Sequence, residues 1–102
     1  MHTKQAKKIT AYKSAFRRDL LPSSNKYYLQ QGLVFIGGGK WRSCICPFHK
    51  DKVLNLRVHL ESGAFRCMAC GVHGGDVLAF HKLRYELNFS DAARDLGAWE
   101  AQ

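Results

Sequence analysis

The sequence has no apolar run that approaches the roughly 20 residues of a membrane span, no internal repeat and no low-complexity segment. Its first residues, Met1 to Lys4, begin a polar, basic stretch and not a signal peptide. Acidic residues are few, eight in 102, and no cluster of them resembles a catalytic magnesium site. These absences predict a reduced, cytoplasmic protein without the carboxylates of a polymerase, and they disfavour a disulfide-stabilised secreted domain.

Positive charge is in excess. Sixteen Lys and Arg against eight Asp and Glu give a net charge of +8, which attracts polyanions. Simple solubility is the alternative explanation for such a charge. A chain of 102 residues predicts one domain, 1–102, whose core is modest and for which a structural metal is a common source of stability.

Two short motifs carry most of the information: Cys46-Pro47-Phe48-His49 and Cys67-Met68-Ala69-Cys70. In each, the two-residue gap lets one tight turn direct two side chains at a single metal ion. The seventeen residues between His49 and Cys67 suffice for one strand going out and one returning. The pattern predicts a zinc ribbon with Cys46, His49, Cys67 and Cys70 as ligands of one Zn²⁺. Since protein fills all four positions, the zinc is structural and not catalytic.

Two rival ligands remain open. Cys44 could replace His49 to give four thiolates, but a one-residue gap to Cys46 makes a poor metal-binding turn, so a small strand residue is the preferred interpretation of Cys44. His73 follows the second motif and is a weaker alternative to His49.

The N-terminal part predicts two helices. Apolar residues recur at steps of three and four in the range 4–20, which indicates a basic amphipathic helix ending before Pro22; they are Ile9, Tyr12, Phe16 and Leu20. A second, short helix is expected over Lys26 to Gln31, ended by Gly32.

The central part, residues 33–70, predicts strands. Leu33 to Ile36 and Lys40 to Ile45 are expected to form a hairpin about three glycines. Val53 to Leu60 alternates, with Leu54, Leu56, Val58 and Leu60 on the apolar side. A two-residue turn at Ser62-Gly63 would pair His59 with Arg66 and put Phe65 and Cys67 on that same side.

The C-terminal part, residues 75–97, predicts two helices. Asp76 is expected at the start of the first, whose buried stripe would be Val77, Phe80 and Leu83. Ser90 is the expected N-cap of the second, which would end at Gly97. The predicted fold class is therefore α+β: a zinc ribbon with a small antiparallel sheet, flanked by N-terminal and C-terminal helices.

These motifs resemble the zinc-binding domain of DnaG-type bacterial DNA primases. The resemblance covers the two metal-binding motifs, the strand hairpin between them, Gly74-Gly75-Asp76-Val77, and the ending from Leu87 to Leu96. The segment from Leu20 to Arg42 looks more like short stand-alone members carried by plasmids, prophages and integrative elements. The resemblance implies recognition of a single-stranded DNA template, with a replication primase or helicase acting in trans.

The chain departs from the primases in two respects. The metal-binding histidine is not followed by the usual Pro-Ser-Phe start of the next strand; here the chain reads Val53-Leu54-Asn55-Leu56. No segment resembles the polymerase domain or the helicase-binding domain, so a non-enzymatic module is expected. The alternative function is a protein-interaction adaptor that docks on a polymerase or another replication or transcription protein without touching DNA.

The expected DNA surface is the polar side of the sheet. Basic side chains there can follow phosphates, and an exposed aromatic residue can stack on a base. The candidates are Lys40, Arg42, Arg57, His59 and Arg66, with Trp41 as the stacking residue. Alternation places Trp41 on the side opposite Lys40 and Arg42, which favours a position in the core over a contact with DNA. The basic N-terminal segment is a second possible contact.

Overall fold

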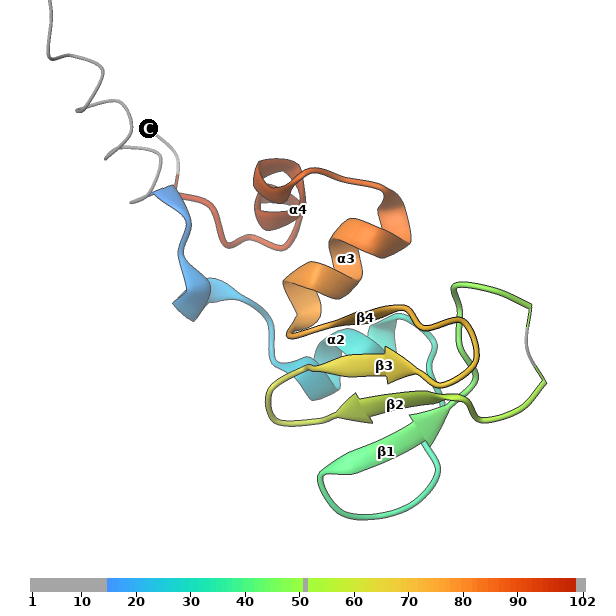
Figure 1. The fold of residues 1–102 in the computed structure, drawn as a ribbon. Helices are drawn as coiled ribbons and strands as arrows, with labels where there is room; N and C mark the ends of the chain where they lie inside the picture. The colour runs from blue at the N-terminus through green and yellow to red at the C-terminus, as the bar shows by residue number, and fades with distance from the viewer. Residues whose placement is uncertain (1–14, 51, 101–102) are drawn as a thin grey trace, which may run out of the picture.

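The chain forms a four-stranded antiparallel sheet with helices packed on one face (Figure 1). A computed structural model describes residues 15–50 and 52–100. The sheet order is β1-β2-β3-β4, and the α+β class is confirmed. The elements, in chain order, are η1 (Arg18–Leu20), α2 (Ser24–Gln30), β1 (Trp41–Cys44), β2 (Leu56–His59), β3 (Phe65–Cys67), β4 (His73–Gly74), α3 (Val77–Tyr85) and α4 (Phe89–Asp95).

The main core lies between the sheet and the helices α2 and α3. Phe80 of α3 is fully buried, and its ring packs edge-on against Tyr28 at 4.9 Å and Phe65 at 5.1 Å. The strands contribute the buried Leu56 and Val58. A smaller cluster under α4 contains Ala92 and Ala93, and Leu21 and Leu96 pack against both clusters. None of the described helices is long and apolar enough to cross a membrane.

The helix boundaries follow side-chain caps. α3 starts where predicted, and Asp76 caps it by accepting a hydrogen bond from the Ala79 N–H at 2.9 Å. The cap of α4 is Asn88 and not Ser90, because the Asn88 carboxamide accepts from the Asp91 N–H at 2.8 Å. α2 begins at Ser24, two residues before the predicted start, because Ser23 caps it. Gly32 and Gly97 follow α2 and α4 with positive φ, as their predicted ends require.

The β2–β3 hairpin has a longer turn than predicted. Arg57 lies opposite Arg66 and Val58 opposite Phe65, so the predicted pairing of His59 with Arg66 is wrong by two residues. The connection spans 60–63, because the His59 N–H bonds to the Ala64 carbonyl and the Gly63 N–H to the His59 carbonyl. A shift of two residues preserves the faces, so Phe65 and Cys67 remain on the apolar side.

Gly63 allows this turn to sit against the helices. Its φ is +84°, and an added Cβ would lie 2.8 Å from Ser24 Oγ and 3.1 Å from the Val77 backbone nitrogen. We expect Gly63→Ala to lower the free energy of unfolding by roughly 2–4 kcal/mol, from left-handed strain and overpacking. Gly38→Ala is the control, because a Cβ at Gly38 meets nothing within 4 Å. Equal urea midpoints for the two variants would contradict this assignment.

The predicted N-terminal helix lies mostly outside the described residues, and its predicted end at Leu20 is wrong. Phe16 forms an antiparallel bridge with Trp99, and Arg17 is extended. The Arg17 N–H bonds to the Ala98 carbonyl at 2.8 Å, and the Glu100 N–H to the Ala15 carbonyl at 2.7 Å. Pairing with the C-terminal segment thus replaces helical hydrogen bonds after Ala15.

Three further expectations from periodicity are wrong. The range 33–36 is not a strand, and only Ile36 forms a bridge, to Ser43. Leu54 is 41% exposed, because β2 begins only at Leu56. Leu83 is 46% exposed, since α3 instead buries Leu78 and His81. His81 joins α2 to α4: its ring nitrogens bond to Tyr27 Oη at 2.7 Å and to Asp95 Oδ2 at 2.5 Å.

Candidate metal centre and nucleic-acid interface

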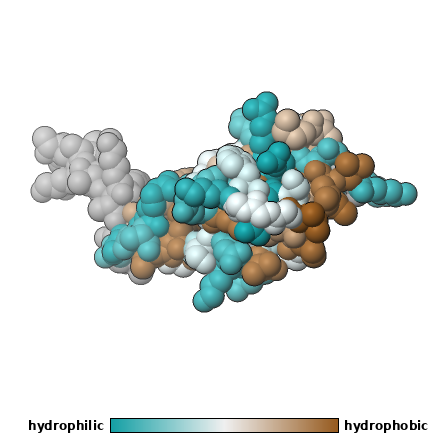
Figure 2. Space-filling view, turned by 90° about the horizontal axis from the view of Figure 1, so that it is seen from below, coloured by the Kyte–Doolittle hydropathy of each residue, from teal (hydrophilic) through white to brown (hydrophobic). Residues whose placement is uncertain are grey.

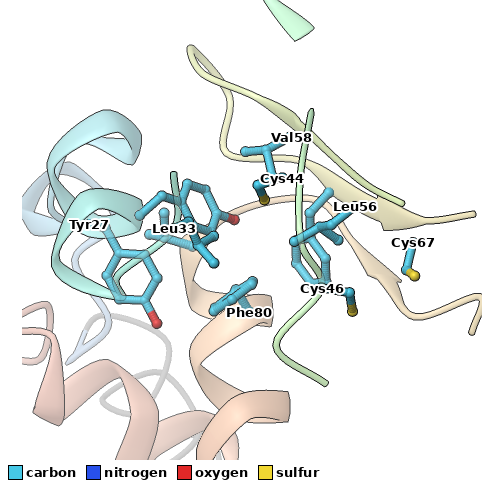
Figure 3. Packing of buried hydrophobic residues seen from close by; sticks show 11 residues of the cluster. Tyr27, Leu33, Cys44, Cys46, Leu56, Val58, Cys67 and Phe80 are labelled. Carbon is cyan, nitrogen blue, oxygen red and sulfur yellow. The ribbon is translucent and has the colours of Figure 1, made fainter. Parts of the chain in front are cut away.

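The four predicted metal-binding residues converge. One ligand atom from each of Cys46, His49, Cys67 and Cys70 lies within 4.8 Å of the other three. Cys46 and His49 come from the turn after β1, whereas Cys67 ends β3 and Cys70 lies in the turn that leads to β4. Figure 3 shows Cys46 and Cys67 together at one end of the buried cluster.

The two turns have the same local design. The Phe48 N–H donates to Cys46 Sγ, and the Ala69 N–H donates to Cys67 Sγ, each at 3.4 Å. The Cys70 N–H also donates to Cys67 Sγ at 3.4 Å. Such hydrogen bonds favour the thiolate form that binds a metal.

The electrostatics of the thiols follow from this design. Burial acts to raise the pKa of Cys67, but the N–H groups of Cys70 and Ala69 outweigh it and hold that pKa below its ordinary value. Burial raises the pKa of the Cys46 thiol above its ordinary value. A bound cation removes that proton, because metal coordination needs the thiolate.

The first turn is also anchored in the core. The Phe48 ring, between the two ligands of this turn, packs against Phe80 at 5.0 Å and stacks on Phe65 at 6.2 Å. Folding of the core and closure of the metal site are therefore coupled.

The donor set fits zinc. Two thiolates on one tetrahedral zinc lie about 3.8 Å apart when each Zn–S bond is about 2.3 Å. The Sγ atoms of Cys46 and Cys70 lie 4.0 Å apart, far beyond the 2.05 Å or so of a disulfide. When bound, the ion supplies a fourfold cross-link between the two turns and no open position for catalysis.

The rival ligands lie elsewhere. Cys44 is fully buried and opposite Leu56, which in turn is opposite Cys67, so Cys44 and Cys67 are two strand spacings apart, about 10 Å. Burial raises the pKa of the Cys44 thiol to about 11. His73 is exposed, and its Nδ1 lies 3.1 Å from the Gly71 carbonyl.

The face of the sheet that points away from the helices carries a continuous row of polar residues. Directly opposed residues in antiparallel strands share a face, so Ser43, Arg57, Arg66 and His73 form a row across all four strands. The neighbouring row pairs Trp41 with His59, whose rings lie 5.0 Å apart. We call these six residues the outer face. The helices of the described residues cover only the other side of the sheet in Figure 1, and the outer face has no carboxylate among its six strand residues.

Comparison with known proteins decides the family. The sequence pattern of the CHC2 zinc finger, the DnaG-type zinc ribbon, matches residues 34–101. The chain belongs to the CHC2 zinc finger family. Family membership and the converging Cys and His side chains together establish one structural zinc in this protein.

Individual relatives agree with this membership. The "Gene 58 protein" of Mycobacterium phage D29 is 38% identical over 55 residues, which are 54% of this chain and 42% of that protein. The DNA primase of Deinococcus radiodurans is 40% identical over 52 residues, 51% of this chain but 9% of the primase. The chain thus spans less than half the length of these relatives.

A solved structure has the same fold. The Aquifex aeolicus primase, crystallised as its zinc-binding and RNA polymerase domains, superposes with a TM-score of 0.63 and 26% identity. The match covers 78% of this chain and 20% of the primase chain.

In this CHC2 zinc finger, the predicted DNA-binding residues do not all lie on the face of the sheet that the sequence predicted for them. Arg57, His59 and Arg66 share one face, as predicted. Trp41 lies with them and is 46% exposed, so the core position that alternation favoured is wrong. Arg42, in contrast, lies opposite the buried Val58. The reason is Cys44: its burial puts every second residue before it, including Arg42, on the inner side.

The remaining basic candidates have local partners. Arg42 donates from Nε to the Gly39 carbonyl at 2.8 Å, and Lys40 pairs with Glu61 at 3.6 Å. Sequence reasoning missed Ser43 and His73 on the outer face. Ser43 lies opposite Arg57 and His73 lies opposite Arg66, which places both on the same face as the arginines. This pairing can be recognised only when the strand register and the short strand β4 are known.

Proposed function

We propose that this CHC2 zinc finger binds single-stranded DNA through its outer face and assists a replication primase or helicase in trans, without catalysing nucleotide transfer itself. In this proposal Cys46, His49, Cys67 and Cys70 are the zinc ligands, and the whole chain acts as one domain in the reducing cytoplasm. The relatives include DNA primases, and this similarity supports the proposed role in replication.

The observation that carries the proposal is the Arg57–Arg66 pair. These side chains lie opposite one another on the two central strands and are exposed. Among the described residues, neither forms an ion pair, although several other arginines do. Two uncompensated guanidinium groups side by side on an uncovered sheet suit adjacent phosphates. The exposed Trp41, packed against His59, adds a stacking surface at one end.

The test is the double variant Arg57→Ala with Arg66→Ala, measured by fluorescence anisotropy with several single-stranded oligonucleotides. We expect about 10- to 30-fold weaker binding, since each charge-assisted contact contributes on the order of 1 kcal/mol net. The slope of log affinity against log salt should fall by about 1.4, from roughly 0.7 for each lost phosphate contact. The loss should be similar across sequences, because phosphate contacts do not read bases.

The matched control removes the same charge elsewhere: Lys82→Ala with Arg84→Ala on α3. Both doubles should melt as cooperatively as the parent. A chain without residues 1–8 tests the basic N-terminal segment. The proposal fails if the Arg57/Arg66 double binds like the parent, or if the truncated chain alone loses binding.

A further inference from the structure

Exposed aliphatic side chains gather where the sheet meets the metal site. Ile45 continues β1 beyond Cys44, and Met68 continues β3 beyond Cys67; they are 47% and 66% exposed. The Met68 N–H donates to the Asn55 carbonyl at 2.8 Å, which extends the β2–β3 register by one residue. Val53 and Leu54, just before Asn55, are 62% and 41% exposed. We call Ile45, Val53, Leu54 and Met68 the zinc-end patch.

The fold does not account for this patch. None of its members belongs to either buried cluster. Figure 2 shows hydrophobic residues gathered at its right-hand end, the end where Figure 1 draws the loop between β1 and β2. Single exposed apolar residues are ordinary, but contiguous ones indicate an interaction site.

The surroundings of the patch are basic. Arg57 and Arg66 lie two residues from Asn55 and Met68 along the same strands and on the same side. Lys50 is exposed in the turn that carries His49. All seven described carboxylates lie outside the stretches 41–60 and 64–75; Asp51 is not among the described residues. A partner surface that is complementary to the zinc-end patch and its basic surroundings is therefore apolar at its centre and acidic at its edges.

We propose that the zinc-end patch docks a protein segment whose aliphatic side chains are flanked by Asp or Glu. Protein is favoured over nucleic acid because all four members are aliphatic, whereas bases stack on aromatic side chains. The outer-face aromatic residue, Trp41, lies four residues before Ile45, about 13 Å along the strand. The inference adds a protein partner to the proposed DNA binding and does not depend on it.

The test uses the full chain and a fluorescein-labelled peptide in which three leucines are spaced among six aspartates. We expect saturable binding by anisotropy. Replacing all aspartates with asparagine, or all leucines with serine, should weaken binding at least tenfold. Val53→Ser with Met68→Ser should weaken it equally while leaving zinc content, melting and oligonucleotide affinity unchanged, since both side chains are more than 60% exposed.

Leu29→Ser with Val34→Ser is the matched control, because these aliphatic residues are 56% and 74% exposed outside the patch. It should bind the peptide like the parent. No binding of the peptide up to about 1 mM overturns the inference, as does equal binding by the patch and control variants. If the patch variant loses oligonucleotide and not peptide binding, the patch is part of the nucleic-acid surface. The Arg57/Arg66 test of DNA binding is judged separately, from oligonucleotide affinity alone.

Discussion

Chelation of the zinc should unfold the sheet and abolish cooperative melting. Cys46 and Cys67 belong to the main buried cluster, and Phe48 between the first two ligands packs on Phe80. Structural zinc sites in small domains contribute on the order of 10 kcal/mol to folding, comparable with the whole stability of a typical domain. Circular dichroism during titration with a strong chelator should therefore lose its near-ultraviolet signal in step with zinc release.

A matched pair of serine variants locates the ligands. Cys67→Ser should reproduce chelation, with little bound zinc by elemental analysis and no cooperative transition. Cys44→Ser should keep one zinc per chain and lose only about 1–3 kcal/mol, because a buried hydroxyl replaces a thiol that packs in the core. Zinc lost from the Cys44 variant but kept in His49→Ala would show that the ligand set is the all-thiolate one.

Local chemistry made the metal turns and the helix start at Asp76 predictable from the sequence. A two-residue gap between ligands fixes the geometry of a turn almost regardless of its surroundings, so the convergence of the two motifs followed once a hairpin joined them. Asp76 likewise acts within three residues of itself, on the Ala79 N–H.

Features that depend on distant partners were not predictable in this way. The predicted helix does not continue to Leu20, because Phe16 pairs with Trp99, more than eighty residues away. The face of Trp41 follows from the burial of Cys44 against Leu56, and alternation alone cannot say which of two faces is the inner one. The four-residue turn at 60–63 depends on Gly63 fitting against Ser24 and Val77.

The buried face of α3 was also not fully predictable from the spacing of its apolar residues. Its apolar spacing suggested that Phe80 and Leu83 both face the core, but α3 also packs against α4, which turns Leu78 and His81 inward and leaves Leu83 46% exposed. Phe80 and Leu83 should therefore differ sharply in their contribution to the free energy of unfolding.

Phe80→Ala should destabilise the domain by about 3–5 kcal/mol, the range for a large aromatic residue lost from a tight core. Its ring contacts Tyr27, Tyr28, Phe48 and Phe65 at centroid distances of 4.9–5.8 Å, and it is fully buried. Leu83→Ala, on the same helix, should cost about 0.5 kcal/mol or less. Urea unfolding of the zinc-bound variants gives both values.

Because the lost ring also supports Phe48, Phe80→Ala should bind zinc more weakly in a chelator competition, whereas Leu83→Ala should not. Similar costs for the two variants would mean that the core is not centred on Phe80, and unchanged zinc affinity in Phe80→Ala would separate the metal site from the core that holds its first turn.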